Sequence, residues 1–313
     1  MNHNSNSNGT ELQADLALIL VTLLAAAGWI FSKEALATFE PFSFISLRFA
    51  SAGLILGLFG WQAILALSVA SLRRVLVVGV CFGCSMVFWV LGIYHGTHLG
   101  VGAFLNSLGV VMVPLVLGLM GGTLPPTLKV TMPLALMGLA CLMLDDSFVF
   151  GWGEASFLVA ASLFALTFVL NSRAAARTSP LALTAIQLFV VGLLAAPLAL
   201  LTEGADGIPD FNVSNATVTG ATVTDVAAWG WMLAAILIAT CVRFFLQTWG
   251  QSKTSASAAA VILVAEPVWS AMLAAVWFDE TMSVVQMAGC GLIFSALLAS
   301  RWNAVRQLLK SCF

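Results

Sequence analysis

Charged residues are scarce in this sequence: 12 Lys and Arg and 14 Asp and Glu make up 8% of its 313 residues, with a formal net charge of -2. Soluble globular chains carry about 25% charged residues, so the composition excludes a soluble domain. Hydrophobic residues account for 61% of the chain. We therefore expect an integral membrane protein whose partners are the lipid bilayer and a small-molecule substrate, without a nucleic-acid partner. A monomer is compatible with the sequence, which does not fix the oligomeric state.

The sequence also lacks the common signatures of membrane enzymes, since it contains no HExxH, GxSxG or P-loop motif. Cys81 and Cys84 form a CxxC inside an apolar stretch with no second CxxC to complete a metal site, and we interpret them as small packing residues. His95 and His98 could bind a metal or sense pH, but capping and solvation at the membrane interface is the favoured interpretation. We expect no metal, no cofactor and no enzymatic activity.

Ten stretches are long and apolar enough to cross a bilayer, which takes about 20 residues of helix. Their apolar runs are continuous and do not alternate with a period of two, which favours helices over a barrel. The expected fold class is an all-α integral membrane protein with ten transmembrane helices. The stretches are 15–37, 42–60, 75–94, 100–120, 128–144, 153–172, 181–201, 227–247, 254–277 and 283–301.

Lys and Arg residues gather on one side of the predicted membrane, as they do in cytoplasmic loops. Arg243 falls near the cytoplasmic end of the eighth span, which leaves Lys33 and Arg48 on the outer half. We predict a multi-pass protein of the inner or plasma membrane with both termini in the cytoplasm. With the N-terminus inside, the cytoplasmic loops and tail hold Arg73, Arg74, Lys129, Arg173, Arg177, Lys253, Arg301, Arg306 and Lys310.

Two pairs of segments repeat in the same order. EPFSFISLRFASAGLILG (40–57) matches SPLALTAIQLFVVGLLAA (179–196), and AFLNSLGVVMVPLVLGLM (103–120) matches AAVILVAEPVWSAMLAAV (259–276). The matches align Pro41 with Pro180, Gly53 with Gly192, and Pro114 with Pro267. Each copy contains five predicted spans, and an odd number inverts the second copy relative to the first. Inverted repeats of this kind are typical of secondary transporters.

These boundaries divide the chain into two five-helix repeats, 15–146 and 147–301, with a disordered cytoplasmic tail at 1–14 and a second tail at 302–313. Residues 202–226 are expected to form an external loop inserted in the second repeat. This loop contains two glycosylation sequons, at Asn212 and Asn215. Chance matches are the favoured interpretation in a loop so rich in Asn, Ser and Thr.

Two ionisable residues inside the spans are candidates for function, because a charge at the bilayer centre costs at least about 2.5 to 3.5 kcal/mol. Glu266 lies near the middle of the ninth span, beside Pro267, which removes a backbone donor. It could carry a proton, bind a substrate ammonium group, or hold helices together. Arg48 could bind a substrate carboxylate; the favoured alternative is a structural residue that snorkels or pairs with Glu40.

Several aromatic and polar side chains lie at central depth in the predicted spans, where they could contact a substrate. Aromatic faces can stack on an organic or cationic ligand, whereas a buried amide can equally bond across helices. These candidates are Trp29, Trp89, Tyr94, Asn106, Thr167, Thr240 and Gln247.

Five segments resemble the EamA-type domain of the drug/metabolite transporter superfamily. They are GWIFSKEAL (28–36), LRFASAGL (47–54), AFLNSLGVVMVPLV (103–116), SPLALTAIQLFVVGLLAAPLALL (179–201) and AEPVWSAMLAAVWFDETMSVVQMAGCGLIFSALL (265–298). The resemblance implies a ten-helix carrier with a central cavity lined by helices one, three, four, six, eight and nine. Members move amino acids, other metabolites or drugs, often as exporters.

The chain departs from the family pattern in two places: in the acidic pair that follows helices four and nine, and in the Glu-Pro element, which is present only once because Val113 precedes Pro114. The family often has an acidic Gly-Glu pair after helices four and nine, where this chain has Gly121-Gly122 and Asp279-Glu280. We expect an exporter of a small metabolite such as an amino acid that works by alternating access, with proton coupling as an open possibility. A drug efflux carrier and an intramembrane enzyme are the alternatives, the enzyme being the less favoured of the two.

Overall fold

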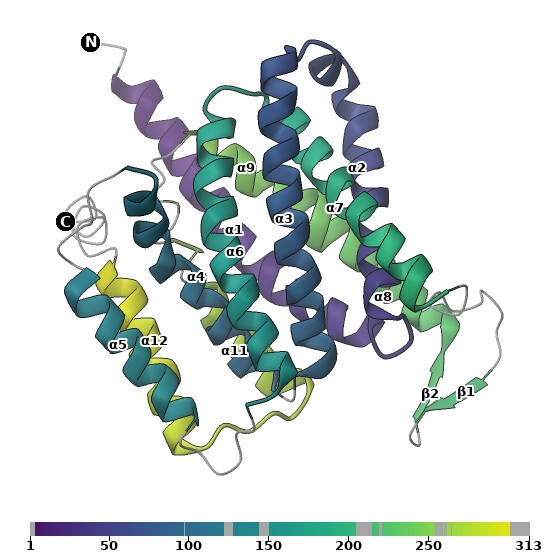
Figure 1. Ribbon diagram of the computed structural model, residues 1–313, viewed down its shortest axis with the longest axis vertical. Helices are drawn as coiled ribbons and strands as arrows, with labels where there is room; N and C mark the ends of the chain where they lie inside the picture. The colour runs from purple at the N-terminus through teal and green to yellow at the C-terminus, as the bar shows by residue number, and fades with distance from the viewer. Residues whose placement is uncertain are drawn as a thin grey trace.

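Helices make up nearly all of the computed structural model, which describes residues 4–96, 98–121, 128–143, 150–204, 215–218, 221–253, 259, 262–263 and 265–300 (Figure 1). The α-helices are α1 (Asn4–Ala35), α2 (Pro41–Leu65), α3 (Val69–His95), α4 (Leu99–Leu119), α5 (Leu128–Met143), α6 (Trp152–Ala175), α7 (Pro180–Thr202), α8 (Asp225–Ile236), α9 (Arg243–Lys253), α11 (Glu266–Trp277) and α12 (Val284–Ser300). A π-helix, η1 (Leu237–Val242), joins α8 to α9, and two strands, β1 (Asn215–Val218) and β2 (Ala221–Thr224), pair antiparallel.

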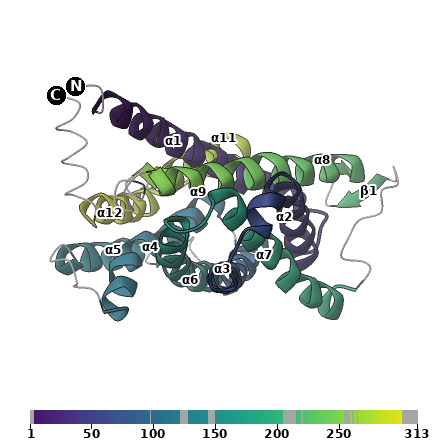
Figure 2. The same cartoon turned by 90° about the horizontal axis from the view of Figure 1, so that it is seen from above.

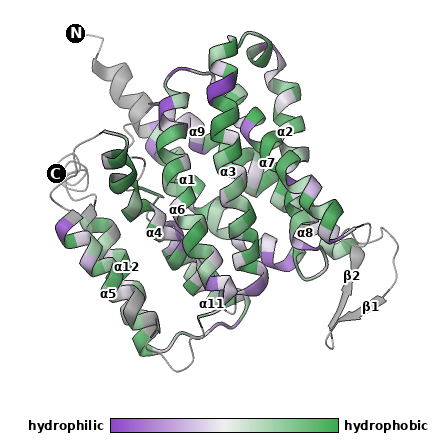
Figure 3. Cartoon of the chain, in the orientation of Figure 1, coloured by the Kyte–Doolittle hydropathy of each residue, from purple (hydrophilic) through white to green (hydrophobic). Residues whose placement is uncertain are grey.

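Seven helical segments in the described part of the chain are long and apolar enough to cross a membrane. They are α1, α2, α3, α4, α6, α7 and the continuous α8–η1–α9 segment. Hydrophobic residues cover most of their length, and hydrophilic residues gather toward the ends (Figure 3). The chain is therefore a multi-pass membrane protein. The three other expected spans contain α5, α11 and α12, which are shorter in the described residues.

Three segments can be compared with the sequence-based expectations. Helix α1 begins at Asn4, so most of the segment 1–14, expected to be disordered, is helical. The loop 202–226 contains the β1–β2 hairpin, in which Asn215 pairs with Thr224; Asn212 lies outside the described residues. The ninth span is expected over 254–277; α11 covers its second half from Glu266, and residues 254–258, 260–261 and 264 lie outside the described residues.

The helices form two layers in the view from above (Figure 2). Helices α1, α8, α9 and α11 lie on one side, and α3, α4, α6 and α7 lie on the other. Four sets of contacts hold the bundle together: α2 packs against α7, α3 against α6, α4 against α6 and α11, and α5 against α12. Helices α2 and α7 both begin with a proline, whose fixed φ suits the first turn of a helix.

Two glycines bring α2 and α7 into backbone contact. A Cβ atom on Gly53 would lie 2.5 Å from the nitrogen of Phe189, and one on Gly192 would collide with the nitrogen of Ala50. Both obstacles are main-chain atoms of a helix, so neither can rotate away. Small residues at such crossings let helices approach closely in lipid, where association depends on van der Waals packing.

We expect Gly53→Ala and Gly192→Ala each to lower the free energy of unfolding by about 1 to 3 kcal/mol, because the added methyl group forces the helices apart. Thermal unfolding of the purified protein in detergent measures this. Gly230→Ala is the matched control, since a Cβ there has nothing within 4 Å and alanine favours the helix. Equal melting temperatures for the three variants would contradict the close contact.

Glu280, which follows α11, ties α1 to α4 at one end of the bundle. Its Oε1 accepts from the Lys33 ammonium of α1 at 2.8 Å and from the Leu99 amide at 3.0 Å, and its Oε2 accepts from the Gly100 amide at 3.1 Å. These amides begin α4, where a helix has unsatisfied donors and a partial positive charge. Burial opposes ionisation, but the hydrogen bonds and the Lys33 charge outweigh it and lower the pKa of Glu280 below its ordinary value.

Other carboxylates bind helix ends at the same end of the bundle, which we call the Glu280 end. Glu203, just after α7, accepts from the Phe42 and Ser43 amides at the start of α2, both at 2.7 Å. Glu34 of α1 accepts from the Trp277 indole at the end of α11 at 2.8 Å. The Glu280 end therefore holds the last turns of α1, α7 and α11 and the first turns of α2 and α4.

Because the pKa of Glu280 is lowered in the folded state, its stabilising effect is complete above the ordinary carboxyl pKa and is lost as the pH falls through the lowered value. We expect Glu280→Gln to cost roughly 1 to 3 kcal/mol of unfolding free energy at pH 7. The variant should also lose less stability in acid than the wild type. Thermal unfolding of both proteins from neutral to acidic pH provides the measurement.

Asp279→Asn serves as the control for this experiment. Asp279 is exposed and has a φ of 51°, which asparagine also tolerates, so its stability at pH 7 should match that of the wild type. If the melting temperatures of the wild type and Glu280→Gln change with pH in the same way, the contacts of the Glu280 carboxylate do not stabilise the fold.

Candidate functional site

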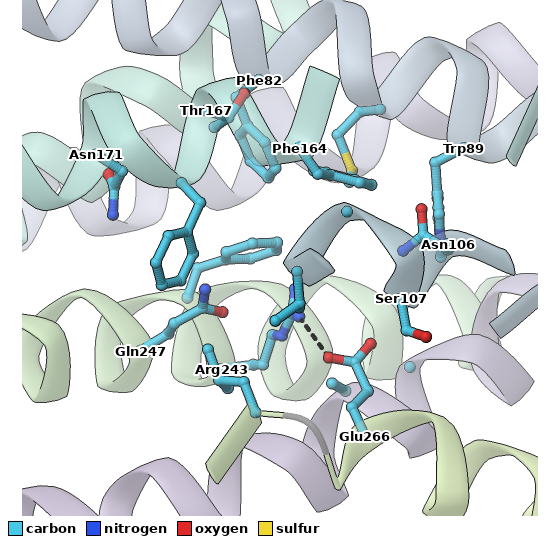
Figure 4. Close-up of a pocket in the computed structure, with 18 of the residues that line it drawn as sticks. Phe82, Trp89, Asn106, Ser107, Phe164, Thr167, Asn171, Arg243, Gln247 and Glu266 are labelled. Carbon is cyan, nitrogen blue, oxygen red and sulfur yellow. Dashed lines mark hydrogen bonds and ion pairs between the residues drawn. The ribbon is translucent and has the colours of Figure 1, made fainter. Parts of the chain in front are cut away.

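A cavity of about 180 Å³ lies between the two helix layers (Figure 4). The resemblance implies that helices one, three, four, six, eight and nine surround it, and residues of α1, α3, α4, α6, η1, α9 and α11 do so in the structure. Helix α2 adds Arg48 and Phe49, and α7 adds Gln187. Among the described lining residues, three are charged: Arg48, Arg243 and Glu266.

Both carboxylate oxygens of Glu266 have a partner in the cavity. Oε2 forms an ion pair with an Nη2 atom of Arg243 at 3.4 Å, and Oε1 accepts from the Trp29 indole at 3.2 Å. The Arg243 and Glu266 side chains are 16% and 20% exposed. Each is therefore mostly buried but keeps some accessible surface in the cavity that it lines. Glu266 lies in the first turn of α11, with Pro267 next to it. A negative charge is favourable at the start of a helix.

Arg243 is the charged site residue that the sequence analysis missed. It lies inside the expected eighth span but was placed near that span's cytoplasmic end, away from any candidate site. In the structure it follows η1 directly and points toward Glu266 (Figure 4). A charged residue within an apolar run was the signal that could have identified it, the same signal that identified Glu266.

Arg48 is buried, with only 3% of its surface exposed, and it bonds to neutral groups on two other elements. Its Nε donates to the Thr240 hydroxyl at 2.7 Å, an Nη1 hydrogen to the Ser32 hydroxyl at 2.8 Å, and an Nη2 hydrogen to the Ala239 carbonyl at 3.5 Å. The expectation that Arg48 snorkels or pairs with Glu40 is wrong. The side chain turns inward because these hydroxyls and the carbonyl offer acceptors inside the bundle.

Two of the three Arg48 contacts, those with Thr240 and Ala239, fall on the π-helix η1. Thr240 donates its own hydroxyl hydrogen to the carbonyl of Ala235, five residues earlier, at 2.7 Å. A π turn is rare and widens the helix by one residue per turn, and such turns are frequent at functional sites. Thr240 is fully buried and does not line the cavity. It instead links Arg48 to the wide turn that precedes Arg243.

Aromatic rings form much of the cavity wall. The rings of Trp29 and Trp89 lie 5.2 Å apart at 71°, and those of Phe82 and Phe244 lie 5.1 Å apart at 68°. Phe164 packs beside Phe82 at 6.1 Å. Edge-to-face pairs of this kind stabilise one another, and they present an apolar surface to a ligand.

Amide groups supply polar contacts around the same cavity. Asn106 and Gln247 line it, and their side-chain oxygens have no protein partner among the described residues. Asn171 donates to the Gln251 oxygen at 2.8 Å, which joins α6 to α9. Thr167 also lines the cavity, with its hydroxyl 3.3 Å from that of Ser85. Within the described part of the chain, the buried oxygens of Asn106 and Gln247 lack a donor, which is costly for a buried polar group.

Tyr94 lies away from the cavity. Its side chain is 42% exposed, and its hydroxyl donates to Glu40 at 3.2 Å at the Glu280 end. The structure therefore brings seven of the nine candidate residues to the cavity and leaves out Tyr94 and Thr240. The seven are Trp29, Arg48, Trp89, Asn106, Thr167, Gln247 and Glu266.

Within the described ranges, no group of three or more His, Cys, Asp or Glu side chains is arranged to hold a metal ion. His98 is the residue before α4, and its side chain forms no hydrogen bond to the first turn of that helix. Cys84 is exposed on α3, and Cys81 is partly buried.

Comparisons with known proteins agree with the geometry. Residues 151–302 match the EamA-like transporter family. A relative described as an uncharacterized transporter from Archaeoglobus fulgidus is 27% identical over 92% of this chain and 85% of its own length. A second uncharacterized transporter from the same organism is 24% identical over 65% of this chain and 67% of its own length.

One solved crystal structure has the same fold, with a TM-score of 0.63 at 18% identity over 94% of this chain and 98% of that chain. At this identity the likeness concerns the fold alone. Together with the multi-pass helical fold, the family match over residues 151–302 and the two relatives support an EamA-type transporter of the drug/metabolite transporter superfamily.

Proposed function

We propose that the protein is a secondary transporter that exports a small metabolite, such as an amino acid, by alternating access. The cavity between the two helix layers carries this proposal, because helices of both halves of the chain line it. Its wall combines aromatic rings, amides and three charged groups, a mixture that can hold a small polar metabolite with an apolar part. Substrate contacts are proposed for the seven cavity residues among the candidates.

The proposed scaffold is two inverted five-helix repeats, 15–146 and 147–301. The directions of equivalent helices support it. Helix α2 begins at the Glu280 end whereas α7 ends there, and α4 begins at that end whereas α11 ends there. The sequence repeat aligns Ala50 with Phe189, and the α2–α7 crossing places Gly53 against Phe189 and Gly192 against Ala50. A two-fold axis between the repeats would produce this reciprocal contact.

We also propose that the Glu280 end faces outward and that both termini are cytoplasmic, in the inner or plasma membrane. The carboxylates of Glu34, Glu203 and Glu280 lie at the Glu280 end. Arg73 and Arg74 lie in the first turns of α3, at its opposite end. Lys and Arg favour the cytoplasmic side, which supports this orientation.

Counterflow in proteoliposomes tests the transport proposal. Vesicles loaded with a pooled metabolite library are placed in a dilute pool of isotope-labelled compounds, and mass spectrometry identifies those that accumulate. We expect at least one small metabolite to exchange, and empty vesicles provide the control. The carrier proposal fails if no compound exchanges. Exchange of hydrophobic drugs in place of metabolites would support the efflux alternative.

Glu266 is the proposed proton carrier if transport is coupled to protons. We expect Glu266→Gln to abolish the pH dependence of net transport while equilibrium exchange remains measurable, since the amide cannot release a proton. Glu40→Gln is the control, because Glu40 bonds to Tyr94 away from the cavity. A pH profile that Glu266→Gln leaves unchanged would remove this role from Glu266.

A further inference from the structure

We infer that the cavity binds an organic anion, with a carboxylate group at Arg48 and an apolar, flat body against the aromatic wall. This inference rests on the proposed transport function, because it names the chemical class of the substrate. Three observations lead to it: the charge of the cavity, the surroundings of Arg48, and the position of the rings.

The cavity has an excess of positive charge. Among its described lining residues, two arginines face one glutamate. The segment between α9 and α11, TSASAAAVILVA at 254–265, contains no charged residue, so it does not change this balance. Arg243 is paired with Glu266, and the unbalanced charge is therefore that of Arg48.

Arg48 has no carboxylate partner among the described residues. Its acceptors are two hydroxyls and one carbonyl. A guanidinium group has five N–H donors, so two remain for a ligand. A buried charge without a counter-charge is costly, and a bound carboxylate would reduce that cost. A carboxylate can also accept two parallel hydrogen bonds from the guanidinium fork.

The rings around Arg48 define where the body of the anion would lie. The Arg48 guanidinium carbon is 5.9 Å from the Trp89 ring and 5.3 Å from the Phe49 ring. Both residues line the cavity, and Trp29 continues the wall from Trp89 toward Glu266. A carboxylate at Arg48 thus places an attached flat group against these rings, where apolar contact and stacking stabilise it.

The second repeat provides a natural comparison. Gln187 occupies the position of Arg48 in the sequence repeat, and it also lines the cavity and is buried. Helix α3, the counterpart of the α8–η1–α9 segment, is continuous from Val69 to His95. The second repeat therefore has a neutral side chain at this position and no π turn opposite it. Arg48→Gln would remove the charge and make the two repeats alike.

Three compounds with one aromatic body and different charges test the inference: phenylacetate, phenylacetamide and phenethylamine. Quenching of tryptophan fluorescence in the full-length protein reports binding, because Trp29 and Trp89 line the cavity. We expect phenylacetate to bind at least about tenfold more tightly than the other two. Equal binding, preference for the amine, or no binding of phenylacetate would overturn the inference.

Two variants should act in opposite directions. Arg48→Gln should weaken phenylacetate binding about tenfold, and Glu266→Gln should strengthen it because the lost negative charge leaves Arg243 unpaired. Arg74→Gln, an exposed arginine at the start of α3, should bind as the wild type does. If Arg48→Gln does not fold, the compound series and Glu266→Gln still decide the question. Weaker binding to Glu266→Gln would contradict the charge argument.

The outcomes separate this inference from the transport proposal. Counterflow that moves only neutral or cationic compounds would overturn the anion inference and leave the carrier intact. Phenylacetate binding with the expected variant effects, but without counterflow of any compound, would support the anion site and count against transport.

Discussion

The close approach of α2 and α7 is the contact on which the rest of the bundle depends. It joins one helix of each half of the chain at backbone distance, through Gly53 and Gly192. Helix α3 packs against α7 as well as α6, and α2 also contacts η1. Arg48 extends from α2 to the hydroxyl of Thr240, so the position of α2 also fixes the wide turn before Arg243. The α2–α7 contact therefore positions the helices of the bundle and also Arg48 of the charged site.

Much of the scaffold could be predicted, because a bilayer imposes simple rules on length and polarity. Pro41 and Pro180 begin the helices that the repeat predicted. The expected and observed positions of some helix ends differ. The third span was expected to begin at residue 75, but α3 begins at Val69, where Ser68 accepts from the Ser71 amide as an N-cap. Tyr94, judged to be at central depth, is next to the last residue of that helix.

The chemistry of the site was only partly predictable. Glu266 and Arg48 could be found because an ionisable residue in an apolar run is rare. Their partners could not, since a sequence does not show which way a side chain turns. Arg48 turns toward Thr240 and not toward Glu40. The π turn over Leu237–Val242 precedes Arg243 directly, and no motif in its sequence, LIATCV, predicts it.

The contacts of Glu280 with Lys33, Leu99 and Gly100 make the Glu280 end of the molecule different from the opposite end. Parting α1 from α4 there means separating an ammonium from a carboxylate and uncovering two helix amides. The matching positions after α4 are Gly121 and Gly122 in the sequence, which have no carboxylate side chain. For an alternating-access carrier, this difference makes the two gating steps energetically unequal. The resting conformation would then be the one in which the Glu280 end is shut, and substrate would first meet the cavity from the opposite face.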